Sequence, residues 1–188
     1  RLSEILEDVK LNSDTLKKLR EIFKPFILRR TKQQVAKELP PKIDQVLYCD
    51  MEEKQAEIYD RLWKWYRQEL IEKEEKTPEA GKKSGVDYLG ALTRLRQASC
   101  HPALISEEWE GVESTKIKVL MEKLKVLMAE GQKVLIFSQY TSFLGLIREQ
   151  VEAEKWKYCY LDGQTKDRAG QVDIFQNNEE FKIFLISL

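Results

Sequence analysis

The chain has 188 residues, of which 32 are Lys or Arg and 32 are Asp or Glu, so its formal net charge is zero. This balance excludes a globally basic nucleic-acid-binding protein, and any nucleic-acid contact has to come from local patches. No apolar run approaches the roughly 20 residues needed to span a bilayer, and no basic start followed by an apolar stretch indicates a signal peptide. We therefore expect no membrane partner.

The cysteines and the histidine exclude several kinds of site. Cys49, Cys100 and Cys159 are odd in number and widely spaced, which is typical of a reducing compartment rather than of a disulfide framework. A structural zinc ion needs about four soft ligands, usually in closely spaced pairs, and this chain has a single histidine and no C-x-x-C. We expect no metal site and no catalytic triad. Cys100 should be buried, and His101 should lie in the core or cap a helix.

The first part of the chain is expected to be mostly helical. A helix is predicted over 16–22, and a second is predicted to begin after Thr31 and to end before Pro40 and Pro41. The β-branched residues of 43–49 indicate an extended segment. Lys and Arg dominate from Lys17 to Lys42, which forms a local basic stretch in an otherwise neutral chain.

Two longer helices follow the extended segment. Apolar residues at spacings of three and four predict amphipathic helices over 51–75 and 87–100. Between them, the residues near 72–86 carry almost no apolar side chains, so we expect a flexible, solvated loop there. Trp63 and Trp65 are interpreted as core or interface residues.

The last third alternates between helix and strand. The expected elements are a helix over 117–128 ended by Gly131, a strand over 134–137, a helix over 143–151, a strand over 158–161, a helix over 166–175 and a strand over 181–188. This order gives two strand–helix–strand units and a parallel sheet, so the fold class is α/β after a mainly α-helical region. The apolar run 134–137 should be buried on both faces, and 181–188 should be an interior strand.

The position of the last strand suggests an incomplete domain. Ligand sites of parallel sheets lie beyond the carboxyl ends of the strands, and the chain stops where such loops would begin. We therefore expect a fragment.

The phosphate-binding motifs of nucleotide enzymes are absent. The glycines form neither G-x-x-x-x-G-K-[ST] nor G-x-G-x-x-G after a strand, and no Asp-Glu dipeptide is present to hold Mg²⁺. These residues alone therefore cannot hydrolyse a nucleotide, and a dinucleotide-dependent oxidoreductase is disfavoured.

Two polar loops follow the first two predicted strands. Ser138–Thr141 and Asp162–Thr165 lie after strand carboxyl ends, with Arg168 in the next helix, so both loops belong to one edge of the sheet. Hydroxyls, amides and free helix N–H groups placed there are suited to the phosphates of one nucleic-acid strand. The same residue types are also ordinary cap and turn residues, and that alternative stays open.

Several segments together resemble the second motor lobe of the Swi/Snf family, helicase-like ATPases that translocate on double-stranded DNA. In the order of the family they are Phe23–Arg30 with Lys32, Leu39–Lys42, Leu95–Gln97 with Cys100–Leu104, Lys133–Gln139, Tyr160–Thr165 with Arg168, and Phe184–Leu188. The resemblance implies a RecA-like parallel sheet, here a truncated second helicase lobe. The three-residue step from Thr165 to Arg168 resembles bacterial members, which implies a cytoplasmic, nucleoid-associated protein, or a nuclear one in a eukaryote.

The resemblance also implies roles for individual residues. Contacts to the nucleic acid are expected from Ser138, Gln139, Thr141, Gly163, Thr165, Arg168 and Ser187. Asp162 belongs to the same turn, and Arg168 is expected to brace it. The basic residues Arg29, Arg30 and Lys32 correspond to the segment that joins the two lobes, where they form a brace or contact DNA.

The resemblance divides the chain into three parts: a helical segment and inter-lobe linker over 1–42, a helical protrusion over 43–114, and the N-terminal part of the second lobe over 115–188. It implies ATP and Mg²⁺ as cofactors of the parent, held between the two lobes, with the nucleotide-binding loop and the Mg²⁺-binding acidic motif in the first lobe. This chain is expected to have no catalytic residue and no ATP hydrolysis of its own. The expected partners are double-stranded DNA and that first lobe. One alternative is a relative that recycles RNA polymerase, with RNA polymerase or DNA-bound proteins as partners. Another is a non-enzymatic interaction module that uses exposed tryptophans.

Overall fold

The computed structural model describes residues 17, 19, 21–28, 30–31, 35–36, 38–40, 42–76 and 84–188, which divide into two compact units, Arg1–Val46 and Leu47–Leu188. In the first unit the described residues 21–23 are helical and lead into the short 3-10 helix η1, Lys24–Phe26. Most of the two helices expected over 16–22 and after Thr31 lies outside the described residues. The segment 43–49 has no regular strand pairing in the described part of the chain.

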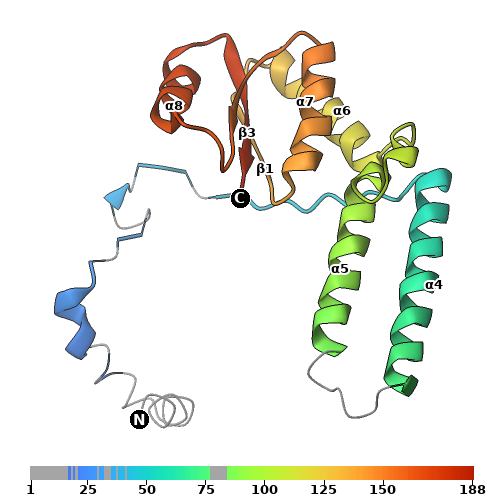
Figure 1. Cartoon of the computed structure of the whole chain (residues 1–188). Coiled ribbons are helices and arrows are strands. Elements are labelled where there is room, and N and C mark those ends of the chain that lie inside the picture. The colour runs from blue at the N-terminus through green and yellow to red at the C-terminus, as the bar shows by residue number, and fades with distance from the viewer. Residues whose placement is uncertain are drawn as a thin grey trace. The chain divides into compact units, whose positions relative to one another are not determined.

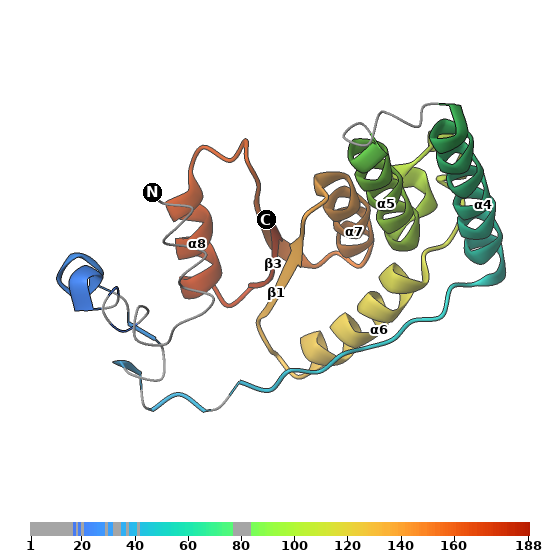
Figure 2. The same ribbon diagram turned by 90° about the horizontal axis from the view of Figure 1, so that it is seen from below.

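An α-helical hairpin opens the second unit. It consists of α4, Glu53–Lys76, and α5, Ser84–Cys100, which lie side by side in Figures 1 and 2. The loop expected near 72–86 is therefore too long, because α4 continues through Lys76 and α5 begins at Ser84; Glu and Lys are good helix formers even without an apolar face. No helix in the described part of the chain has the length and apolar content to cross a membrane.

A compact connection of two 3-10 helices follows the hairpin: η2, Pro102–Leu104, and η3, Glu107–Trp109. His101 is only 6% exposed and is the N-cap of η2, because its Nδ1 accepts a hydrogen bond of 3.0 Å from the N–H of Ala103. The predicted capping role of His101 is confirmed. Cys100 is half-buried rather than fully buried.

The buried histidine gives this connection a pH dependence. Burial lowers the pKa of His101 from its usual 6.5, since the charged ring would lose its hydration. As the pH falls from 7.5 to 5.5, the unfolded chain takes up a proton that the folded chain resists, so the free energy of unfolding should decrease, by at most about 1.4 kcal/mol per pH unit. Urea unfolding midpoints at these pH values measure the effect. His101→Asn keeps an acceptor for the Ala103 N–H and should flatten the profile; an unchanged slope in this variant would contradict the assignment.

Helix α6, Thr115–Ala129, begins and ends with well-defined caps. The Ser114 hydroxyl accepts from the N–H of Ile117 at the start. At the end, Gly131 has a φ of 76°, and the N–H groups of Gly131 and Gln132 return to the carbonyls of Met128 and Leu127. This pairing is the Schellman motif, which a residue without a Cβ adopts readily. The helix end predicted at Gly131 is confirmed.

The rest of the unit is a parallel sheet with a helix after each of its first two strands. In chain order the elements are β1, Val134–Ser138; α7, Thr141–Ala153; β2, Lys157–Leu161; α8, Arg168–Asn177; and β3, Phe181–Ser187. The strand order is β1-β3-β2 and both pairings are parallel, so β3 is the interior strand, as predicted. The α/β fold class is confirmed.

Helices cover the two faces of the sheet unequally. Figures 1 and 2 show α6 and α7 on one face and α8 on the other. The main core lies on the first face and is formed by Met121, Leu124, Ile136, Leu144, Ile147, Val151, Ile183 and Leu185. On the second face the rings of Phe175 and Phe184 lie 5.2 Å apart.

The expectation that residues 134–137 are buried on both faces is wrong. Leu135 and Phe137 point to the α8 side of the sheet and are 50% and 53% exposed, while Ile136 is buried on the other side. The reason is that β1 lies at an edge of the described sheet, next to β3 alone.

Candidate nucleic-acid interface

The carboxyl ends of the three strands meet at one edge of the sheet. Ser138 at the end of β1 is the register partner of Ser187 on β3, and Leu161 at the end of β2 pairs with Ile186, one position earlier. The N–H of Leu188 donates to the carbonyl of Ser138 at 3.0 Å, so the hydrogen bonding between β1 and β3 continues to the end of both strands. With neighbouring strands about 4.8 Å apart, the loops after β1 and β2 are separated by roughly 10 Å at this edge. We call this edge the rim.

The first loop presents an open helix end at the rim. The Ser138 hydroxyl accepts from the N–H of Tyr140 at 3.0 Å, so this side chain shapes the turn. Gln139 and Thr141 are exposed, and no side chain caps α7 in this described segment. Unpaired N–H groups and the positive end of the helix dipole favour an anion at such a position.

The second loop is held by its own hydrogen bonds. The Asp162 carboxylate accepts from the N–H of Gln164 at 2.9 Å and from the hydroxyl of Thr165 at 3.0 Å. The same hydroxyl accepts from the N–H of Asp162 at 2.9 Å. Thr165 therefore uses its hydroxyl both as donor and as acceptor to hold the turn. Gly163 is exposed at the tip. The resulting tight turn presents its backbone outward.

The acidic and basic residues of the second loop differ in their hydrogen-bond partners. Asp167 is the N-cap of α8 and accepts from the N–H of Gly170 at 2.8 Å, while Asp162 accepts from its own turn. Lys166 and Arg168 are exposed, and Arg168 reaches the carbonyl of Asp162 with Nη2 at 3.4 Å. Both carboxylates are therefore bonded to backbone N–H groups, and the two cations face solvent. The rim is locally suited to an anion although the loop sums to zero charge.

The structure brings most of the predicted contact residues together. Ser138, Gln139, Thr141, Gly163, Thr165, Arg168 and Ser187 all lie along the rim or in its two loops. Arg168 is the first residue of α8, because this helix begins two residues later than the predicted start at 166. Arg29 and Lys32 lie outside the described residues, and Arg30 is exposed in the other unit.

Comparison with known proteins identifies the family. Residues 3–104 match the model of the SNF2-related domain, and residues 115–188 match that of the helicase conserved C-terminal domain. The chain belongs to the SNF2-related family. The second match covers α6, the sheet and both rim loops.

Individual relatives agree with this assignment. The human SWI/SNF-related matrix-associated actin-dependent regulator of chromatin subfamily A member 1 is 32% identical over 92% of this chain, which corresponds to 17% of the human protein. The "SWI2/SNF2 ATPase core in complex with dsDNA" of Sulfolobus solfataricus superposes with a TM-score of 0.67 and 29% identity, covering 95% of this chain and 38% of that one. The isolated C-terminal domain of the Sulfolobus ATPase gives a TM-score of 0.65 at 26% identity, over 76% of this chain and 61% of that domain. The chain thus spans about a fifth of the length of the curated relatives it matches.

Two groups of polar contacts were not predicted from the sequence. The internal bonding of Asp162 and Asp167 depends on loop geometry, although Asp before a helix is a common cap signal that would have indicated Asp167. The second group, around Gln55 and Thr115, joins residues about 60 positions apart, and no local pattern marks it.

Proposed function

We propose that this chain supplies part of the DNA track of an ATP-dependent translocase that acts on double-stranded DNA and remodels protein–DNA complexes. The observation that carries the proposal is the rim: an uncapped helix end, an outward-facing turn and Arg168 lie along one edge of the sheet. Phosphate contacts of this kind position a protein on a duplex without reading its sequence. The similarity to a core bound to double-stranded DNA supports the same partner.

ATP and Mg²⁺ are proposed as cofactors of the longer protein and not of this chain. The described residues contain no group of three or more His, Cys, Asp or Glu side chains placed to hold a metal ion. The sequence also has no glycine-rich phosphate loop. Because the residues present do not fit ATP with Mg²⁺, the nucleotide site is assigned to the remainder of the protein. The first motor lobe is proposed as the partner of the lobe in this chain.

The compartment of the protein and its further partners are proposed from separate observations. A bacterial, cytoplasmic protein is supported by the step from Thr165 to Arg168 alone, whereas the relatives named above are human and archaeal. RNA polymerase as a partner stays a prediction. The interaction-module alternative is favoured by one observation: Trp63 and Trp65 on α4 are 42% and 56% exposed.

Binding of duplex DNA at several salt concentrations tests the proposal. We expect weak binding, with a dissociation constant in the micromolar range or above, that does not depend on sequence. A plot of log K against log salt should have a slope near −0.9 for each phosphate contacted, so about −2 to −3 for contacts at two loops. Fluorescence anisotropy of a labelled duplex measures this, and the same preparation should show no Mg²⁺-dependent ATP turnover. Absent or salt-independent binding would favour the interaction module, and ATP turnover would contradict the assignment of the nucleotide site.

A further inference from the structure

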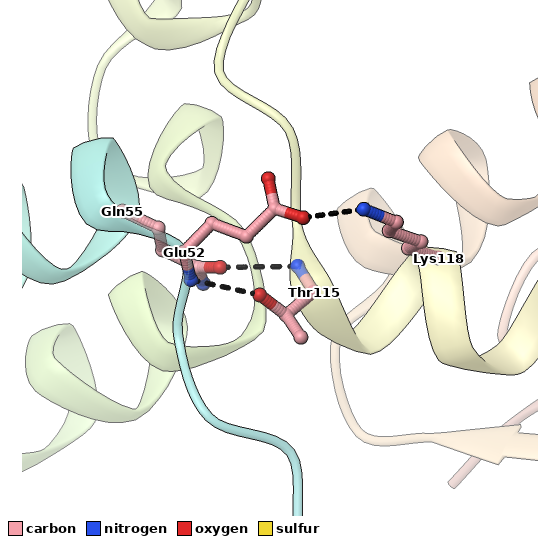
Figure 3. A network of polar contacts seen from close by, with 4 residues as sticks. All are labelled: Glu52, Gln55, Thr115 and Lys118. Carbon is pink, nitrogen blue, oxygen red and sulfur yellow. Dashed lines mark hydrogen bonds and ion pairs between the residues drawn. The ribbon is translucent and has the colours of Figure 1, made fainter.

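A polar cluster joins three helix ends that are far apart in the sequence. It lies where the start of α4 meets the end of α5 and the start of α6, and Figure 3 shows four of its residues, Glu52, Gln55, Thr115 and Lys118. Because all three helices belong to the unit Leu47–Leu188, the cluster lies between the hairpin and the helicase lobe of one compact body. We call it the hairpin node.

Gln55 is the centre of the node. Gln55 is only 1% exposed, and its side-chain amide both donates and accepts a hydrogen bond. Nε2 donates to the carbonyl of Ala98 on α5 at 3.3 Å, and Oε1 accepts from the N–H of Thr115 on α6 at 3.1 Å. One amide group therefore connects all three helices. Removing it would leave the buried Ala98 carbonyl and the part-buried Thr115 N–H without this partner, and an unpaired buried polar group costs more than its bond contributes.

A second layer of contacts surrounds Gln55. The N–H of Glu52 donates to the Thr115 hydroxyl at 3.0 Å, and the Glu52 carboxylate pairs with Lys118 at 2.6 Å. The Ser114 hydroxyl donates to the carbonyl of Cys100 at 2.5 Å. These contacts tie both ends of the hairpin to the first turn of α6.

Among the described residues, the hairpin contributes no side chain to the main core of the lobe. The main core consists of residues from α6, α7, β1 and β3. Ile58, Ala91 and Ala98 are also buried, but they belong to the hairpin and lie outside that core. Hydrogen bonds are directional whereas apolar contact is not, so the bonds of Gln55 to α5 and α6 are suited to fix the orientation of the hairpin.

We propose that the hairpin node, with Gln55 as its positioning residue, fixes the α4–α5 hairpin rigidly to the lobe, so that the hairpin acts as a lever. The 24 residues of α4 extend about 36 Å from the node at 1.5 Å per residue. A rotation of about 10° of the lobe would then displace the far end of the hairpin by roughly 6 Å. Movements of the lobe are carried to whatever the hairpin contacts, and loss of the node uncouples the two parts while each keeps its own core.

Distance distributions between two spin labels test this rigidity. The labels are placed at the exposed positions Lys64 on α4 and Lys123 on α6, in a variant of the full chain with its three cysteines replaced. The parent should give one narrow distribution. Gln55→Leu has a similar volume but no polar groups, and it should broaden the distribution at least twofold while the circular dichroism of the helices stays the same.

Two further variants complete the experiment. Lys118→Gln removes an ion pair whose side chains are 55% and 41% exposed, and such pairs contribute little, so its distribution should stay narrow. Thr115→Val removes one acceptor and keeps the N–H that Gln55 binds, so it should broaden the distribution to an intermediate width. If Gln55→Leu loses its helical signal, Thr115→Val decides the matter. The proposal would be overturned if folded Gln55→Leu gave a distance distribution as narrow as that of the parent. If Gln55→Leu does not fold, the same result for Thr115→Val would overturn it.

Discussion

Leu185→Ala is expected to destabilise the helicase lobe by about 2–5 kcal/mol, the usual cost of truncating a fully buried leucine. Leu185 has no exposed surface and lies in the middle of β3, the interior strand of the described sheet. Its neighbours in the core come from helices as well as strands, so the cavity is enclosed on several sides and cannot easily collapse. A domain of this size is commonly stable by only 5–15 kcal/mol, so the change is a large fraction of the total.

Leu135→Ala is the matched control, since it removes the same atoms from a strand of the same sheet. Leu135 is 50% exposed on β1, and we expect a loss below about 1 kcal/mol. Urea unfolding compares the two variants. If the dependence of the unfolding free energy on urea concentration stays the same, the loss expected for Leu185→Ala shifts the midpoint by about 1–3 M. Equal shifts for the two leucines would mean that β3 is not the interior strand.

The parallel sheet could be predicted from the sequence because its signals are local. Alternating helical and strand-like apolar patterns with short connections leave few topologies, and the predicted interior position of residues 181–188 is confirmed. A local signal gave a wrong prediction for residues 134–137, which were expected to be buried on both faces of the sheet. A continuous apolar run indicates burial on both faces, but strand order depends on contacts between segments about 50 residues apart, so the run does not distinguish an edge strand from an interior one.

The rim could be predicted only in part. Parallel strands place the loops after β1 and β2 at one edge, which needs no knowledge of side chains. The sequence could not indicate how the polar groups are divided between turn and solvent. The hydroxyls of Ser138 and Thr165 are engaged within their loops, whereas Gln139, Gly163 and Arg168 face outward. The cap and turn interpretation is therefore supported for Ser138 and Thr165, and phosphate contact stays a prediction for Gln139, Gly163 and Arg168.

Arg168→Gln is expected to weaken DNA binding about fivefold and to reduce the magnitude of the salt slope by about 0.9. The substitution removes one exposed cation at the rim, and it also removes the 3.4 Å contact to the carbonyl of Asp162. That contact is long, and the turn keeps the three shorter bonds that involve Asp162 and Thr165. The loop should therefore keep its shape while one phosphate contact is lost. Anisotropy titrations of a labelled duplex over a range of salt concentrations give both quantities.

Arg94→Gln distinguishes a phosphate contact from a general charge effect, because it removes the same charge from an exposed position on α5, away from the rim. Its salt slope should equal that of the parent. Equal reductions in the two variants would mean that DNA is bound by the overall field of the protein. In a longer protein with both lobes, Arg168→Gln should lower the DNA-stimulated ATPase activity more than the basal activity, because only the stimulated reaction depends on the DNA track. An equal loss of both activities would mean that Arg168 supports the fold of the loop and does not contact DNA.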